Sequence, residues 1–174
     1  MTVYVALLRG INVGGNTKVA MPALKALFES AGFDDVRTYI NSGNVVFRSS
    51  KAPNVSALER RIVADLDVPA KVLVRSAAQL QKVVDANPYP KAAARELYVT
   101  FLAVKPAATK VKVLEAPAND PAAFEARGQE VYLHSPTGYS NTKLSNAFFE
   151  KQLGVDATTR GWPTVLKLLE LANG

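Results

Sequence analysis

The sequence predicts an α+β protein built from two successive units in which strands and helices alternate along the chain. Two observations predict this fold class. Short apolar runs bounded by turn residues recur through the 174 residues, and segments with apolar residues at helical spacing separate them. In addition, the segment Tyr4-Val5-Ala6-Leu7-Leu8 resembles Tyr98-Val99-Thr100-Phe101-Leu102, as a degenerate internal duplication would produce.

The first unit is expected over residues 1–75. Its expected elements are a strand at 3–8, a helix at 21–31, hairpin strands at 36–40 and 45–47, a helix at 55–66 and an edge strand at 71–75. The first strand is continuously apolar, which is typical of a central strand. In the second helix, Ser56 and Glu59 have capping-box spacing. The order β-α-β-β-α-β is the ferredoxin-like arrangement.

The second unit is expected over residues 76–174, and it nearly repeats this order. Ser76 and Gln79 form another capping-box pair, which opens a linking helix. The remaining elements are a strand at 97–104, a short helix at 109–115, a hairpin of 124–127 and 130–134, and closing helices at 142–153 and 163–172. We therefore expect two tandem ferredoxin-like units within one compact domain, the second unit incomplete and followed by two C-terminal helices.

Composition limits the classes of function. The net charge of +6, from 21 basic and 15 acidic residues, favours anionic partners. The absence of cysteine excludes disulfides, thiol catalysis and thiolate metal sites. No apolar stretch approaches the roughly 20 residues of a membrane span, and the N-terminus lacks a signal pattern. A cytoplasmic protein with no membrane partner is the expectation.

The most informative segment is the polar, Gly-rich stretch at residues 9–18, which joins the first strand to the first helix. Arg9 and Lys18 flank it, and no acidic residue precedes Glu29. Such strand-to-helix loops present free backbone N–H groups to an anion. The loop matches neither the Walker A motif nor the GxGxxG fingerprint. The alternative interpretation is a wide turn in which Gly14 and Gly15 supply positive φ angles.

The topology brings a second polar loop to the same place. In a split β-α-β unit, the loop after the first strand and the following hairpin lie at the same end of the sheet. We therefore expect Asn12 or Asn16 to lie near Asn41 or Asn44. Taken alone, the sequence Asn41-Ser42-Gly43-Asn44 is an ordinary hairpin turn.

Catalytic constellations are mostly absent. His134 is the only histidine, and no His/Asp/Glu cluster has metal-ligand spacing, so neither a metal nor a cofactor is expected. A third polar segment contains Lys143, Arg160 and Trp162. We expect the ring of Trp162 to pack the last helix onto the core, and we expect Arg160 to lie among turn residues.

Three motifs resemble the family called domain of unknown function 1697. They are Leu7-Leu8-Arg9-Gly10-Ile11-Asn12-Val13-Gly14-Gly15, Tyr39-Ile40-Asn41-Ser42-Gly43-Asn44-Val45-Val46-Phe47, and Lys143-Leu144-Ser145-Asn146 with Thr158-Thr159-Arg160 and Trp162. The resemblance implies a small bacterial protein with tandem ferredoxin-like units and no established activity. The chain departs from the family pattern at Gly161 and Pro163, where the family tends to carry Asn.

The leading interpretation is a protein that binds a small phosphate-bearing, nucleotide-like ligand. The expected ligand-binding residues are Arg9, Asn12, Gly14, Gly15, Asn16, Lys18, Asn41, Ser42, Asn44, Lys143 and Arg160. The alternatives are nucleic-acid binding, a phosphoryl- or nucleotidyl-transfer enzyme that uses the same cleft, and a module that binds an acidic partner protein. The sequence leaves the oligomeric state open.

Overall fold

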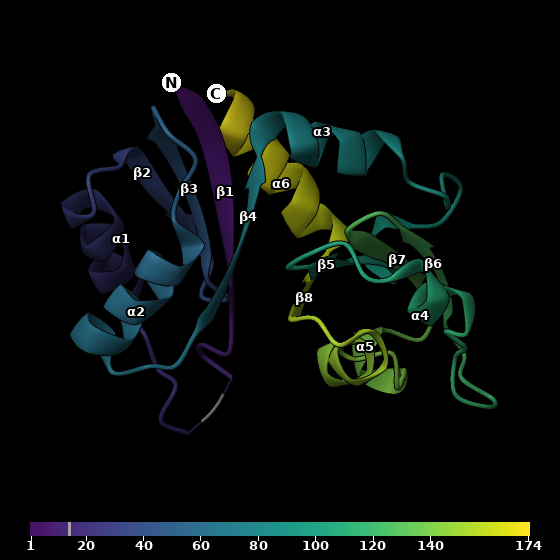
Figure 1. The fold of residues 1–174 in the computed structure, drawn as a ribbon. Helices are drawn as coiled ribbons and strands as arrows, with labels where there is room; N and C mark the ends of the chain where they lie inside the picture. The colour runs from purple at the N-terminus through teal and green to yellow at the C-terminus, as the bar shows by residue number, and fades with distance from the viewer. Residues whose placement is uncertain (14) are drawn as a thin grey trace. The chain divides into compact units, whose positions relative to one another are not determined.

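The computed structural model describes residues 1–13 and 15–174, and it is a mixed α+β structure (Figure 1). Contacts divide the chain into a first unit, Met1–Gln81 with Leu168–Gly174, and a second unit, Lys82–Lys167. In chain order the elements are β1 (Thr2–Arg9), α1 (Met21–Ser30), β2 (Asp34–Tyr39), β3 (Asn44–Ser49), α2 (Val55–Leu66), β4 (Lys71–Ser76), α3 (Ala77–Asp85), β5 (Leu97–Leu102), α4 (Ala108–Lys112), β6 (Ala123–Arg127), β7 (Glu130–His134), α5 (Asn146–Leu153), β8 (Ala157–Gly161) and α6 (Trp162–Asn173). The division after residue 81 lies inside α3, whereas the sequence placed it after residue 75.

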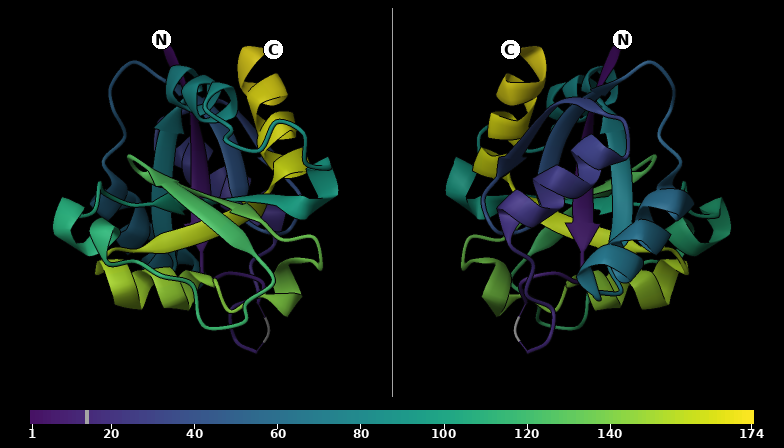
Figure 2. Two further views of the ribbon diagram at one scale, coloured as in Figure 1. Left: turned by 90° about the vertical axis from the view of Figure 1, so that its right-hand side faces the viewer. Right: turned by 90° about the vertical axis from the view of Figure 1, so that its left-hand side faces the viewer.

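The first unit contains an antiparallel sheet with the strand order β2-β3-β1-β4. The apolar strand β1 is central and β4 is an edge strand, as the sequence predicts. Helices α1 and α2 lie across one face of this sheet, as the right-hand view of Figure 2 shows. Their buried side chains Phe28 and Ile62 pack with Ala6 and Leu8 of β1 in one apolar cluster. This cluster fixes the ends of β1 and α1, and therefore the loop between them.

The second unit contains a sheet of the same kind, with the strand order β6-β7-β5-β8. The prediction that this unit is incomplete is wrong, because β8 supplies its fourth strand. The sequence of β8, Ala-Thr-Thr-Arg-Gly, has little apolar character, so its composition did not indicate a strand. Backbone pairing with the apolar strand β5 holds these residues in a strand, although few of their own side chains are apolar.

The two predicted capping boxes have different outcomes. The box at the start of α3 is confirmed, since the Ser76 N–H donates to Gln79 Oε1 at 2.8 Å and the Gln79 N–H donates to Ser76 Oγ at 3.1 Å. The box at Ser56 is wrong. Helix α2 begins at Val55, so Ser56 lies inside it, and the N-cap is Asn54, whose Oδ1 accepts from the Ala57 N–H at 3.0 Å. In the described part of the chain, no helix has the length and apolar character that crossing a membrane requires.

Candidate functional site

The loop after β1 and the turn between β2 and β3 meet at one end of the first sheet. The Leu8 N–H donates to the Gly43 carbonyl at 2.8 Å, and Asn12 Nδ2 donates to the Asn41 carbonyl at 2.7 Å. The predicted proximity of Asn12 and Asn41 is therefore confirmed. The antiparallel arrangement causes it, because β1 ends where β2 ends and β3 returns between them.

Asn12 is the residue that joins these two loops. Its backbone has a φ of 53°, in the left-handed region that Asn adopts more readily than most residues. Its side-chain Oδ1 accepts from the Val19 N–H at 2.8 Å, while Nδ2 donates to the carbonyls of Val19 at 3.1 Å and Asn41 at 2.7 Å. Because both Nδ2 hydrogens have protein acceptors, we assign Asn12 a positioning role rather than a ligand contact.

The turn between β2 and β3 approaches the first loop closely. Gly43 has a φ of 83°, and a Cβ added there would lie 2.6 Å from Ile11 Cδ1 and 2.9 Å from Leu8 Cβ. Ile40 has a φ of 48°, which is a strained conformation for a β-branched residue. Asn44 is fully buried and donates to the Tyr39 carbonyl at 2.9 Å. The glycine therefore permits the close contact between the loops, while the buried asparagine holds the turn itself.

A hollow of about 470 Å³ opens beside this contact, and Asn12, Lys18, Val19, Ala20 and Asn41 line it. We call it the α1 groove, because Ala20 is the N-cap residue of α1. Within residues 1–13 and 15–174, no side chain caps this helix, and its first turn contains no acidic residue. Pro22 in that turn has no N–H, which leaves Met21 and Ala23 as the donors. The positive end of the helix dipole therefore remains unneutralised by the protein, and Lys18 adds a full positive charge.

Other predicted residues of the first loop do not line the α1 groove. Arg9 follows Leu8 on β1, so its side chain points to the sheet face opposite the α1 and α2 core. Asn16 and Gly15 are exposed, and Gly15 has a φ of 62°. Gly14 lies outside the described residues. The exposed Ser42 accepts a hydrogen bond from Asn44 Nδ2 at 2.8 Å through its hydroxyl.

The third group of predicted residues belongs to the second unit. Lys143 is exposed, and its backbone N–H donates to Asp120 Oδ2 at 2.7 Å. Arg160 does not lie among turn residues, and that prediction is wrong. It lies on β8 with 7% of its surface exposed, and its Nη1 donates to Thr158 Oγ1 at 2.8 Å and to the Thr159 carbonyl at 3.0 Å. Burial lowers the pKa of Arg160 to about 10, so the side chain stays charged at neutral pH.

Asp120 is a structural residue that the sequence did not single out. It accepts hydrogen bonds from the Lys143 N–H and the Thr142 hydroxyl, each at 2.7 Å, and from the Ala122 N–H at 2.9 Å. Burial alone would raise the pKa of Asp120, but these hydrogen bonds and the nearby Lys143 charge hold it below its usual value. A signal was present in Asn119-Asp120-Pro121, which has the composition of a turn.

Groups with catalytic chemistry are few in the described residues. His134 Nε2 lies 3.1 Å from Glu96 Oε2, and the His134 ring packs 5.5 Å from the ring of Tyr89. The Tyr132 hydroxyl donates to the Val83 carbonyl at 2.6 Å, and burial raises its pKa to about 12. Among residues 1–13 and 15–174, no group of three or more His, Cys, Asp or Glu side chains could hold a metal ion.

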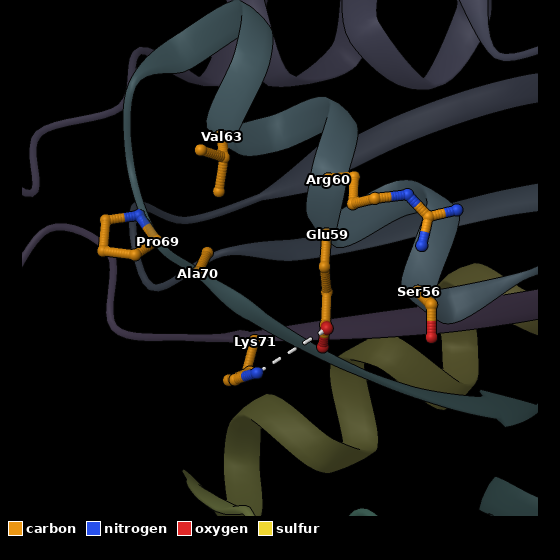
Figure 3. A pocket seen from close by; sticks show the side chains of 7 residues that line it. All are labelled: Ser56, Glu59, Arg60, Val63, Pro69, Ala70 and Lys71. Carbon is orange, nitrogen blue, oxygen red and sulfur yellow. Dashed lines mark ion pairs between the residues drawn. The ribbon is translucent and has the colours of Figure 1, made fainter.

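A second hollow in the first unit, of about 390 Å³, lies between α2 and β4 (Figure 3). Arg60 and Lys71 give it two cations, but the Glu59 carboxylate lies among them, 3.9 Å from Lys71 Nζ. Glu59 Oε1 also accepts from the Val72 N–H at 2.9 Å. Because a fixed carboxylate occupies this hollow, it suits an anion less well than the α1 groove, whose lining contains no acidic residue.

Comparison with known proteins supplies a family and a fold. The chain is similar to the solved structure of the conserved bacterial protein SP0830 from Streptococcus pneumoniae, with 23% identity and a TM-score of 0.71. The similarity covers 100% of this chain and 99% of that chain, and at this identity it establishes the fold alone. No curated protein matches the chain. The family match extends over residues 1–132, which include the α1 groove and both loops that form it, and the chain therefore belongs to the DUF1697 family of proteins of unknown function.

Proposed function

We propose that the α1 groove binds a small anionic ligand that carries a phosphate group, as a nucleotide does. The observation that carries the proposal is the uncapped start of α1 in a hollow without carboxylates. N–H groups in the first turn of a helix have no acceptor within the helix, and a phosphate oxygen satisfies them well. Lys18 on the rim supplies a charge-assisted contact to the same phosphate.

The hydrogen bonds of the Asn12 side chain, which we call the Asn12 clamp, support this proposal because they form the groove in advance. These hydrogen bonds, to Val19 and Asn41, hold both walls before any ligand arrives. Because the loops are already ordered, ligand binding costs less conformational entropy, and the affinity is higher. The positive φ angle of Ile40 is consistent with a functional loop, since strained backbone is concentrated at binding sites.

Calorimetric titration with AMP and with inorganic phosphate tests the proposal. We expect AMP to bind, and we expect Lys18→Ala to weaken its binding by about 1–2 kcal/mol, the scale of one charge-assisted contact. The matched control is Lys25→Ala, because Lys25 is also an exposed lysine, lies within α1, pairs with Glu29 at 3.8 Å and does not line the groove. If neither compound binds, or if both variants weaken binding equally, the proposal is wrong.

We also propose that the two units are tandem ferredoxin-like units derived from one duplicated ancestor. Equivalent registers support this origin. The hydrogen bond from the Leu8 N–H to the Gly43 carbonyl has a counterpart from the Leu102 N–H to the Gln129 carbonyl, and both measure 2.8 Å. Arg75, opposite Val5, has its counterpart in Arg160, opposite Val99. Both arginines are buried, and each donates Nη1 to the carbonyl of the preceding residue at 3.0 Å.

A further inference from the structure

The two sheets have four edge strands, β2, β4, β6 and β8, and three of them carry a device that hinders pairing with another strand. On β4, the outward N–H of Val72 donates to Glu59 Oε1 at 2.9 Å. On β8, the outward N–H of Ala157 donates to Glu150 Oε2 at 3.3 Å. Side chains from α2 and α5 therefore occupy these two edges.

Strand β2 carries a different device. Its register with β3 shifts between Asp34 and Arg37, and Asp35 within this bulge has a φ of 49°. A bulge bends and twists an edge strand, which interrupts the row of groups that another strand would need. The charged residues Arg37 and Arg48 also pair with Asp35 across the bulge, at 3.5 and 3.4 Å.

As far as the described residues extend, strand β6 has neither an outward N–H bonded to a helix side chain nor a bulge. Its five residues pair with β7 without a register shift. The Leu102 N–H bonds to the Gln129 carbonyl, so residue 129 faces β5 and Glu130 faces Arg127 of β6. The backbone groups of Phe124 and Ala126 consequently point away from β7. Among the described residues, none donates to or accepts from these outward groups.

We infer that β6 is a self-association edge, which pairs antiparallel with β6 of a second copy of this chain. The charge pattern of the strand identifies the occupant. Glu125 and Arg127 stand two positions apart on one face, form an ion pair at 3.3 Å within the strand, and are both nearly half exposed. Arg127 Nη1 also donates to the Ala86 carbonyl at 2.6 Å, so each charged group would share its present partner with the second copy. When two copies pair about Ala126, Glu125 lies opposite Arg127 of the partner subunit, and this pairing occurs twice by symmetry.

Only this register combines correct hydrogen bonding with charge complementarity. Pairing about Ala126 places the outward backbone groups of Ala126 opposite their own copies, and those of Phe124 opposite Gly128 of the partner subunit. Pairing about Glu125 instead places two carboxylates opposite each other, which is unfavourable. The partly buried Phe124 and Ala126, which pack on the core of the second unit, would continue as one apolar strip across the joined sheet.

Sedimentation equilibrium of the full chain, up to roughly 1 mM, tests this inference. We expect a monomer–dimer equilibrium that Glu125→Arg weakens roughly tenfold and that Arg127→Glu weakens to a similar extent. The doubly reversed variant, Glu125→Arg with Arg127→Glu, restores the complementary pair, and we expect it to dimerise as the parent protein does. A parent protein that remains monomeric, or single reversals that leave association unchanged, would overturn the inference.

A second pair of variants decides the matter if a charge reversal disturbs folding. Ala126→Pro removes an outward N–H, a change that edge strands tolerate, and it should abolish dimerisation. Thr38→Pro is the matched control, because Thr38 holds an outward position on the β2 edge, next to Arg37 and Tyr39. Circular dichroism verifies that both variants are folded. Equal effects of the two prolines on association would contradict the assignment to β6.

Discussion

The two units contain sheets with equivalent strand order, but the loops that connect their strands and helices differ greatly in length. In the first unit, residues 10–20 connect β1 to α1, and residues 40–43 connect β2 to β3. In the second unit, residues 103–107 connect β5 to α4, and residues 128–129 connect β6 to β7. The second unit makes these two connections with five and two residues. The longer connections of the first unit contain the residues that line the α1 groove.

Glycine substitutions in the two hairpin turns should give the largest difference in unfolding free energy between the units. Gly43→Ala places a Cβ against Ile11 and Leu8 and also adopts a left-handed φ, so we expect a loss of about 3 kcal/mol in unfolding free energy. Gly128→Ala has a φ of 59° but no atom within 4 Å of the new Cβ, and we expect a loss of about 1 kcal/mol. Urea denaturation measures both variants. Equal losses would mean that the close approach of the two loops does not stabilise the first unit.

The next largest effect should come from the clamp that exists only in the first unit. Asn12→Ala leaves the Val19 N–H and the carbonyls of Val19 and Asn41 without their side-chain partner, and we expect a loss of about 2 kcal/mol. The exposed Asn16 serves as control, and Asn16→Ala should change the unfolding free energy by less than about 0.5 kcal/mol. Hydrogen exchange of the amides at residues 12 and 19 locates the effect. Unchanged protection there would contradict the positioning role of Asn12.

A smaller, pH-dependent effect should appear only in the second unit, which fastens its loops with the Asp120 carboxylate instead of a neutral amide. Since the pKa of Asp120 is lower in the folded protein than the unfolded value of about 3.9, its contribution is complete at neutral pH and is lost as the pH falls through the folded pKa. We expect Asp120→Asn to cost about 1 kcal/mol at pH 7, with the difference from the parent protein vanishing in acid. Unfolding measured from pH 7 to pH 2.5 checks this. A constant difference across that range would show that the charge contributes nothing.

Periodicity and topology predicted most of the first unit from sequence, because its strands are apolar and its helices have regular apolar spacing. The contact between Asn12 and Asn41 was predictable because strand order alone places both loops at one end of the sheet. Strand β8 was not predictable from its own polar residues, since its pairing with β5 determines its structure. The roles of the site residues were also not predictable, because no local sequence pattern distinguishes an asparagine that binds backbone groups from one that contacts a ligand.

The most direct test of the α1 groove is a nuclear magnetic resonance titration of the ¹⁵N-labelled chain with AMP. We expect shifts at the amides of Lys18, Met21 and Ala23, which surround the uncapped start of α1. The amides at the start of α2 serve as internal control, since Asn54 already caps that helix. Shifts confined to the first turn of α1 and to Lys18 would agree with an anion held there. Shifts of equal size at α2, or no shifts at α1 while AMP binds, would contradict the account.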